Sequence, residues 1–253
     1  MHDDRLVPLA GGHNFRDFGG YPTVDGRRVV RGGLFRSGVM SHLTADDEER
    51  LRALGIVTIC DLRTRAERDE RPTRWFDDTC DLLVDDDTEP TTTLRALLDR
   101  PDSSEEEGRD AMIALYRELP FKHRAMYRAM FRRLVDGRVP LVVNCSAGKD
   151  RTGVGAALVL RALGVAPDLI ERDFLATATA LDTARLLGDT GFARGVDVSS
   201  RVVAAMMTVV PQYLGAAFAA IDERCGSFDR YRVEELGVDD ADLARMRAIL
   251  LEG

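Results

Sequence analysis

The chain has 253 residues, of which 45% are hydrophobic, and a formal net charge of −8 at pH 7. This length and apolar content fit a single domain whose core needs no metal or disulfide for stability. The net acidity argues against a broad nucleic-acid-binding surface, so any anionic ligand has to be held locally. The cysteines are far apart and match neither a zinc site nor a disulfide framework: Cys60, Cys80, Cys145 and Cys225.

The distribution of apolar residues predicts a cytoplasmic protein without an integral membrane segment. Residues 1–4 show no basic segment leading into an apolar one, so a signal peptide is not expected. The longest apolar stretches, such as 202–210, fall short of the ~20 residues that a membrane-spanning helix requires. Secretion by a leaderless route is the alternative to a cytoplasmic location.

Glycines and short apolar runs predict strands and helices in the first part of the chain. Glycine pairs within the first forty residues mark turns around short extended pieces. A helix is expected from Thr44, its N-cap, to Leu54, with Gly55 ending it. β-Branched residues then predict a buried strand over 56–62, and a further strand is expected over 78–84.

From residue 85 to about residue 119 the chain is polar, and we expect an irregular insert or lid there. Acidic clusters at 85–87 and 105–107 set this segment apart. A helix over 122–136 and a buried strand over 139–143 are expected next. Strands that alternate with helices predict an α/β fold with a mainly parallel central sheet flanked by helices.

The rest of the chain is predicted to be mostly helical. Helices are expected over 168–180, 202–224 and 239–251. We therefore expect one domain over residues 1–253, in which residues 165–253 form a helical lid and the C-terminal packing.

One segment combines a nucleophile with a phosphate clamp. Residues 144–153 read Asn-Cys-Ser-Ala-Gly-Lys-Asp-Arg-Thr-Gly, and they lie between the strand over 139–143 and a helix-like run that ends at Leu163. A loop at a helix N-terminus directs backbone N–H groups at an anion and binds phosphate readily. A helix dipole and nearby cations lower the pKa of a cysteine from about 8.5 to about 3.5–7.5, so a thiolate is expected at Cys145.

Each residue type in this segment suits phosphoryl transfer. The thiolate of Cys145 is the expected nucleophile. Arg151 is expected to grip two phosphoryl oxygens with its planar fork, a bidentate contact that lysine cannot make. Thr152 is expected to donate its hydroxyl to the departing sulfur. The expected phosphate-binding residues are Ser146, Ala147, Gly148, Lys149 and Arg151.

Two other interpretations of this segment are weaker. A nucleotide-binding P-loop needs glycine where Val143 stands and serine or threonine where Asp150 stands. A structural cysteine beside a capped helix would not require so many separate residue types together.

The segment resembles the Cys-x5-Arg-Thr/Ser signature of cysteine-dependent phosphatases. Its Ala-Gly-Lys-Asp-Arg stretch is similar to that of the bacterial tyrosine-protein phosphatases, which act on phosphotyrosine and in some cases on phosphoserine/threonine and phosphoinositides. The resemblance covers nearly the whole chain and implies a cysteine-phosphatase-like fold and metal-independent, cofactor-free hydrolysis. Further motifs similar to this family stand at residues 14–20 (Asn-Phe-Arg-Asp-Phe-Gly-Gly), 34–37, 61–63 and 226–228.

Asn144 departs from the family pattern, which usually has histidine before the nucleophile. An asparagine amide can hydrogen-bond the loop but cannot carry a charge. We expect Asn144 to make the thiol less acidic than histidine would, without loss of function.

The general acid is not marked by a Trp-Pro-Asp sequence, because none occurs here. The lone tryptophan, Trp75, is expected to be a packing residue. The family resemblance implies Asp150 as the acid. Arg151 favours the ionised form of this carboxyl, whereas the phosphate dianion and the Cys145 thiolate oppose that effect. We favour Asp150, with the acidic tract at 85–87 as the alternative.

Other charged residues have supporting roles in this prediction. Lys149 is expected to be a second cation at the loop rim, suited to polyanionic headgroups, or else a solvated lysine. The alternating charges over 63–71 indicate a solvated surface, and the dispersed histidines predict no metal site. Residues expected to brace the loop or line the pocket are Arg16, Asp17, Asp61 and Arg63, with a structural ion pair favoured for the two arginines.

The predicted function is a protein-tyrosine phosphatase that forms a phosphocysteine intermediate and also accepts phosphoserine/threonine. Its partners are expected to be phosphorylated proteins or phosphoinositides, and not nucleic acid. A phosphoinositide phosphatase is one alternative, although the net acidity weighs against it. A phosphate-binding pseudophosphatase is the other alternative, and only Asn144 favours it.

Overall fold

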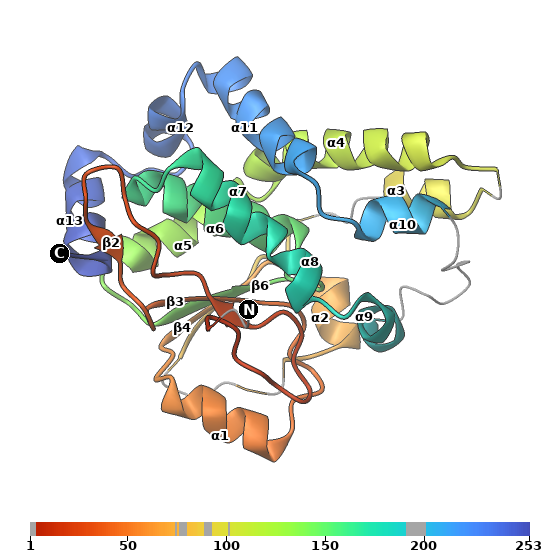
Figure 1. Cartoon of the computed structure of the whole chain (residues 1–253), viewed down its shortest axis with the longest axis horizontal. Helices are drawn as coiled ribbons and strands as arrows, with labels where there is room; N and C mark the ends of the chain where they lie inside the picture. Colours follow the sequence, from red (N-terminus) through yellow and green to blue (C-terminus); the bar gives the residue numbers. More distant parts are fainter. Residues whose placement is uncertain (1–3, 74, 76–79, 89–92, 101, 191–200) are drawn as a thin grey trace.

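A five-stranded sheet lies at the centre of the molecule, with helices on both of its faces (Figure 1). The computed structural model describes residues 4–73, 75, 80–88, 93–100, 102–190 and 201–253. All neighbouring strands pair in parallel except β1, which runs antiparallel to β3. The predicted α/β fold class is therefore confirmed. The strand order is β1 (Arg16–Asp17), β3 (Leu34–Ser37), β6 (Leu141–Asn144), β4 (Thr58–Asp61) and β5 (Asp81–Leu83).

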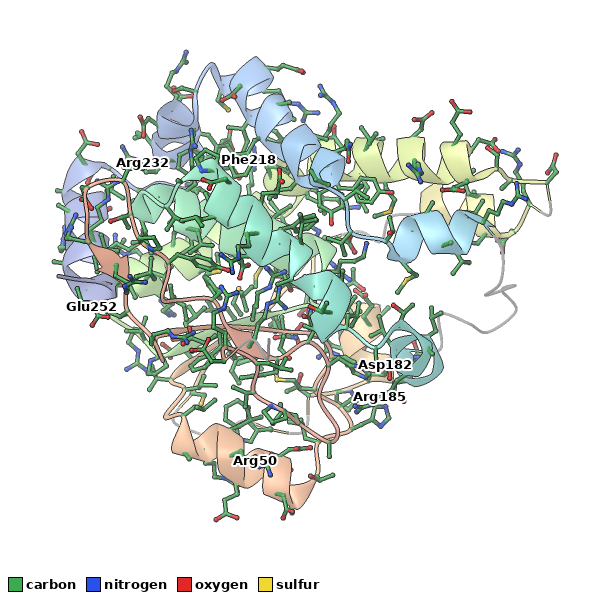
Figure 2. The ribbon with its side chains drawn as sticks, viewed as in Figure 1. Arg50, Asp182, Arg185, Phe218, Arg232 and Glu252 are labelled. Carbon is green, nitrogen blue, oxygen red and sulfur yellow. The ribbon has the colours of Figure 1, made fainter. Side chains whose placement is uncertain are left out.

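The central strand β6 is buried on both faces. Successive side chains of a strand point to opposite faces, and Leu141 and Val143 accordingly join one apolar cluster while Val142 joins another. Side chains fill the space between the sheet and the helices on either face (Figure 2). The predicted strand over 78–84 is confirmed as the shorter β5, and its first residues lie outside the described part of the chain.

Helix α1 (Ala45–Ala53) covers one face of the sheet and has the predicted ends. Thr44 is the N-cap and forms a capping box with Asp47, and Gly55 follows the C-cap with a φ of 63°. Leu51 packs from this helix into the cluster that contains Trp75, which is buried as expected. Local capping signals were sufficient to place this helix because its N-cap threonine and the glycine after its C-cap have strong positional preferences.

The prediction of an irregular insert between residues 85 and 119 is wrong. This segment contains α3 (Thr93–Leu98) and most of the long helix α4 (Glu105–Lys122). The acidic cluster at 105–107 is the first turn of α4, where negative charge stabilises the helix dipole and Glu107 completes a capping box with Ser104. Helix α5 (Arg124–Val135) follows almost directly, within the predicted helix over 122–136.

The C-terminal part is helical, as expected, but more finely divided. The predicted helix over 202–224 is two helices, α10 (Arg201–Met207) and α11 (Pro211–Cys225), because residues 208–210 separate them and Pro211 starts the second one. Helix α6 (Asp150–Leu163) starts directly after residues 145–149. A two-stranded sheet of β2 (Arg28–Val29) and β7 (Leu251–Glu252) joins the two ends of the chain. The remaining helices are α2 (Arg65–Glu70), α7 (Pro167–Leu175), α8 (Thr177–Ala180), α9 (Thr183–Thr190), α12 (Phe228–Glu234) and α13 (Asp240–Leu250).

Within the described ranges, no single helix is long and apolar enough to cross a membrane. Helices α10 and α11 meet the length and composition criteria only when taken together, and they are bent by 62° at their junction.

The register of the parallel strands brings three chain segments to one edge of the sheet. Ser37 of β3 and Asp61 of β4 both pair with Asn144 of β6, so the strands end side by side. The segments that follow these three strands therefore meet at the carboxyl edge, which is where open α/β sheets place their ligands.

His123, between α4 and α5, makes stability sensitive to pH. The side chain is buried, and burial lowers the pKa of His123 to about 3. In the unfolded chain the pKa is about 6.5, so between these values the unfolded state binds more protons and acid favours unfolding. We expect His123→Gln to lose about 2 kcal/mol less stability than the wild type between pH 7 and pH 5, measured by urea unfolding. An equal loss in both proteins would contradict this assignment.

Candidate active site

The segment 145–149 forms a tight loop between β6 and α6. Gly148 has a φ of 67°, and a Cβ atom there would lie 2.6 Å from the carbonyl group of Ser37. Only glycine accepts both constraints without strain. The loop is therefore pressed against the end of β3, and Cys145 at its start is buried, with 2% of its surface exposed.

Three consecutive backbone carbonyl groups of this loop accept hydrogen bonds from residues outside the loop. The carbonyl of Ser146 accepts a hydrogen bond from the backbone N–H of Val39 at 2.9 Å. The Asn14 amide donates to the carbonyls of Ala147 at 3.2 Å and Gly148 at 2.9 Å. The Gly148 carbonyl also accepts from Arg36 Nη2 at 3.0 Å.

This pattern orients the N–H groups of the loop. A trans peptide holds its C=O and N–H in opposite directions, so the N–H groups of residues 147–149 point away from the groups that bind the carbonyls. The N-cap of α6, Lys149, makes no side-chain cap hydrogen bond, which leaves the first N–H groups of that helix without a side-chain cap. The loop and the helix end together present donors to an anion.

Arg151 is held by a residue that the sequence did not identify, Glu67 of α2. Its Nη1 and Nη2 donate to the two Glu67 oxygens at 2.7 and 2.8 Å, and Nη1 also donates to the carbonyl of Leu62 at 3.1 Å. Glu67 further accepts from the Ser146 hydroxyl at 2.6 Å. Burial raises the pKa of Glu67, but the Arg151 hydrogen bonds outweigh burial and hold it below its usual range. The prediction of a merely solvated surface over 63–71 is therefore wrong at Glu67.

Asp150 lies at the first position of α6, next to Arg151. Its Oδ1 accepts a hydrogen bond from the Tyr116 hydroxyl at 2.7 Å and forms an ion pair with Lys149 Nζ at 2.7 Å. The Asp150 side chain remains about a quarter exposed, at 24%. It is therefore fixed by two donors and still reachable from solvent.

Lys149 does not lie at the loop rim, contrary to expectation. Its side chain is 2% exposed, and Nζ donates to the backbone carbonyls of Met206 at 2.8 Å and Thr208 at 3.4 Å. These carbonyls lie at the junction of α10 and α11. The ammonium group thus connects the loop to the C-terminal helices in this structure.

Asn144 and Thr152, on either side of the loop, have buried polar side chains. The side-chain amide of Asn144 is buried, and neither its nitrogen nor its oxygen has a hydrogen-bond partner in the described part of the protein. The amide therefore makes none of the hydrogen bonds to the loop that its chemistry would allow. The Thr152 hydroxyl is likewise buried without a partner there, so its donation to the sulfur remains a prediction.

Of the four expected supporting residues, Asp61, Arg63 and Arg16 are buried and form specific contacts near the loop. Arg63 forms a buried ion pair with Asp61 at 2.6 Å, as favoured from the sequence. Arg16 donates to Thr177 and to the backbone of Asp173, and it also binds the side chain of Asn14, so it supports the loop indirectly.

Asp17 does not take part in the loop through its described contacts. It accepts from the backbone N–H groups of Gly19 and Gly32, and burial raises its pKa. It braces the N-terminal turns instead.

The acidic tract at 85–87 is a weaker candidate for the proton donor than Asp150. The Thr88 hydroxyl donates to Asp85 and holds the pKa of that carboxyl below its usual value. Asp86 forms an ion pair with Arg68. These side-chain contacts of Asp85 and Asp86 are with residues outside the loop, whereas Asp150 follows Lys149 directly.

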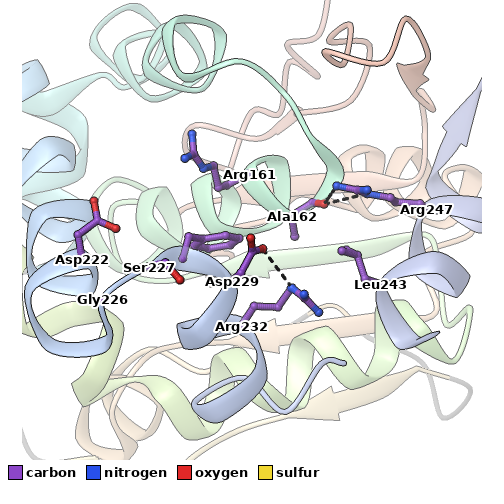
Figure 3. Close-up of a pocket in the computed structure, with 10 residues that line it drawn as sticks. Arg161, Ala162, Asp222, Gly226, Ser227, Asp229, Arg232, Leu243 and Arg247 are labelled. Carbon is purple, nitrogen blue, oxygen red and sulfur yellow. Dashed lines mark hydrogen bonds and ion pairs between the residues drawn. The ribbon is translucent and has the colours of Figure 1, made fainter. Parts of the chain in front are cut away.

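The Gly-Ser-Phe motif at 226–228 lines a separate cavity of about 520 Å³ (Figure 3). Arg247 donates to the carbonyl of Ala162, and Arg232 forms ion pairs with Asp229 and Asp240. These bonds join α6, α12 and α13, so we attribute a structural role to this motif.

Four residues of the site were missed: Asn14, Arg36, Glu67 and Tyr116. Asn14 and Arg36 belong to the family-like motifs at 14–20 and 34–37, but the sequence indicated no function for either residue. Arg36 is fully buried and forms an ion pair with Asp173 at 2.6 Å. Glu67 stands three residues after Thr64, a capping-box spacing that marks the start of α2 but not its contact with Arg151.

We expect Asn14 to control phosphate affinity through the loop carbonyls. Asn14 has a φ of 54°, so Asn14→Gly keeps the backbone and removes two hydrogen bonds of about 1 kcal/mol each. The affinity of Cys145→Ser protein for inorganic phosphate should fall by up to about thirtyfold, measured by calorimetry. The isosteric Asn14→Asp should weaken binding further, because a carboxylate would face two carbonyls. Unchanged affinity in both variants would refute this role.

Comparison with known proteins agrees with this geometry. Residues 7–252 match the model of the tyrosine phosphatase family. A putative tyrosine-protein phosphatase of Cupriavidus necator is 35% identical over 91% of this chain and 84% of its own length. The triple specificity protein phosphatase PtpB of Mycobacterium tuberculosis is 32% identical over 96% of this chain and 98% of its own length. The chain belongs to the tyrosine phosphatase family.

Proposed function

We propose that this protein is a protein-tyrosine phosphatase that hydrolyses phosphomonoesters through a phosphocysteine intermediate and also accepts phosphoserine/threonine. The observation that carries the proposal is the loop whose three carbonyls are bound from outside, next to Cys145 and the oriented fork of Arg151. Such a site binds a phosphoryl dianion and stabilises the charge that its oxygens carry in the transition state. The names of the two relatives from Cupriavidus necator and Mycobacterium tuberculosis support the assignment.

The proposed reaction has two steps. In the first, the Cys145 thiolate forms a bond to phosphorus, the ester P–O bond breaks, and Asp150 gives its proton to the departing oxygen. In the second, Asp150 accepts a proton from water as the water oxygen attacks phosphorus and the P–S bond breaks. Thr152 donates a hydrogen bond to the sulfur as it leaves. The proposal requires no metal and no cofactor.

Phosphorylated proteins are the substrates that we favour over phosphoinositides. PtpB is named a triple specificity phosphatase. In this chain, however, the ammonium of Lys149 is bound to backbone carbonyls and to Asp150 rather than presented to a headgroup. We place the reaction in the cytoplasm, since a thiolate nucleophile is preserved in a reducing compartment.

Turnover of three substrates in the presence of EDTA tests the proposal. We expect hydrolysis of a phosphotyrosine peptide, with slower hydrolysis of a phosphoserine peptide, and a loss of more than about a thousandfold in Cys145→Ser. Phosphate binding without any turnover would indicate a pseudophosphatase instead. Hydrolysis of phosphoinositide alone would indicate a lipid-headgroup phosphatase.

The role of Asp150 is tested by the leaving group. Asp150→Asn removes the proton donor, so kcat/KM, which reports the first step, should fall about a hundredfold on phenyl phosphate but less than about tenfold on p-nitrophenyl phosphate, whose leaving group needs little protonation. Steady-state kinetics on the two esters measures the difference. Equal losses on both would count against Asp150 as the acid.

A further inference from the structure

Tyr116 reaches the active site from the middle of α4. The side chain is completely buried, and its hydroxyl donates to Asp150 Oδ1 at 2.7 Å. Lys149 Nζ contacts the same oxygen at 2.7 Å. Two donors from different elements thus converge on one carboxyl oxygen, and neither contact involves Oδ2.

We propose that Tyr116 is a positioning residue that directs the catalytic proton of Asp150 onto Oδ2. This inference rests on the proposed function, in which Asp150 protonates the leaving group. A neutral carboxyl group carries its proton on one oxygen and accepts hydrogen bonds on the other. Because Oδ1 accepts from both Tyr116 and Lys149, the proton is directed to Oδ2, the oxygen that neither donor contacts.

The proton transfer then has a defined path. The Oδ2–H bond breaks, the proton moves to the departing ester oxygen, and its bonding electron pair stays on the carboxyl group. The resulting carboxylate is stabilised by the same two donors. Tyr116 keeps its own proton throughout, because burial, reinforced by the Asp150 charge, raises the pKa of Tyr116 well above its ordinary value.

The aromatic surroundings hold the Tyr116 ring in place. It stacks on Tyr213 of α11, with ring centroids 5.4 Å apart, and meets the edge of Phe174 of α7 at 5.9 Å. The hydroxyl of Tyr213 donates to the carbonyl of Ala205 at 3.0 Å and does not contact Asp150. Tyr213→Phe is therefore a matched control, since it removes a buried hydroxyl from the same stack.

The test compares Tyr116→Phe with Tyr213→Phe on two esters. We expect Tyr116→Phe to lower kcat/KM about tenfold on phenyl phosphate and less than about twofold on p-nitrophenyl phosphate, with little change in the affinity for inorganic phosphate. Tyr213→Phe should change both rates by less than about twofold. In an Asp150→Asn background, Tyr116→Phe should cause no additional loss, because the two residues act through one proton.

Several outcomes would overturn the inference. Equal losses on both esters in Tyr116→Phe, no loss on either, or an undiminished effect in the Asp150→Asn background would each exclude a role through the proton. Binding of inorganic phosphate to each variant shows that the loop remains folded. A wild type without turnover would overturn the proposed function and this inference with it, whereas an active wild type with any of the results above would overturn this inference alone.

Discussion

The outward orientation of the loop carbonyls is the constraint on which the site depends. A loop of five residues would not by itself turn three successive peptides the same way, because backbone C=O groups also favour contact with solvent. Here the N-terminal segment and β3 supply the partners, through Asn14, Arg36 and the N–H of Val39. The parallel register of β3 and β6 brings these partners to the loop. The orientation of the loop carbonyls is thus a consequence of strand order.

Buried charge is the cost of this arrangement, and each buried cation near the loop has a partner. An unpaired buried ion is strongly destabilising, whereas a well-bonded pair is roughly neutral. Arg36 is paired with Asp173, and Lys149 is bound to Asp150 and to two carbonyls. Asp173 belongs to α7, and the two carbonyls lie at the α10–α11 junction. Packing of the C-terminal helices onto the sheet is therefore coupled to the electrostatics of the loop, and this explains why the charges do not lie at its rim.

The sequence predicted what local patterns specify and missed what depends on distant partners. The helix from Thr44 and the buried strands around 58 and 141 follow from caps and β-branched runs, so they were predicted nearly correctly. Helix α4 was missed because its acidic first turn resembles a solvated segment, although Met112, Tyr116 and Leu119 lie at helical spacing and are buried. The Lys149–Met206 and Arg151–Glu67 contacts each join residues that are more than fifty positions apart in sequence. No local pattern encodes such pairs.

In the proposed reaction, Glu67 determines which edge of the Arg151 guanidinium a phosphate meets. The Glu67 carboxylate accepts hydrogen bonds from Nη1 and Nη2, the end of the guanidinium. The Nε atom of Arg151 has no partner among the described residues. The side edge of a guanidinium, formed by Nε and one Nη, offers a second bidentate geometry. A phosphoryl dianion can therefore bind the side edge while Glu67 keeps the end. Because Arg151 holds the pKa of Glu67 below its usual range, the carboxylate stays ionised and fixes the fork before the substrate arrives. Donors that are fixed in advance need no reorganisation in the transition state, which is the condition under which electrostatic stabilisation is largest.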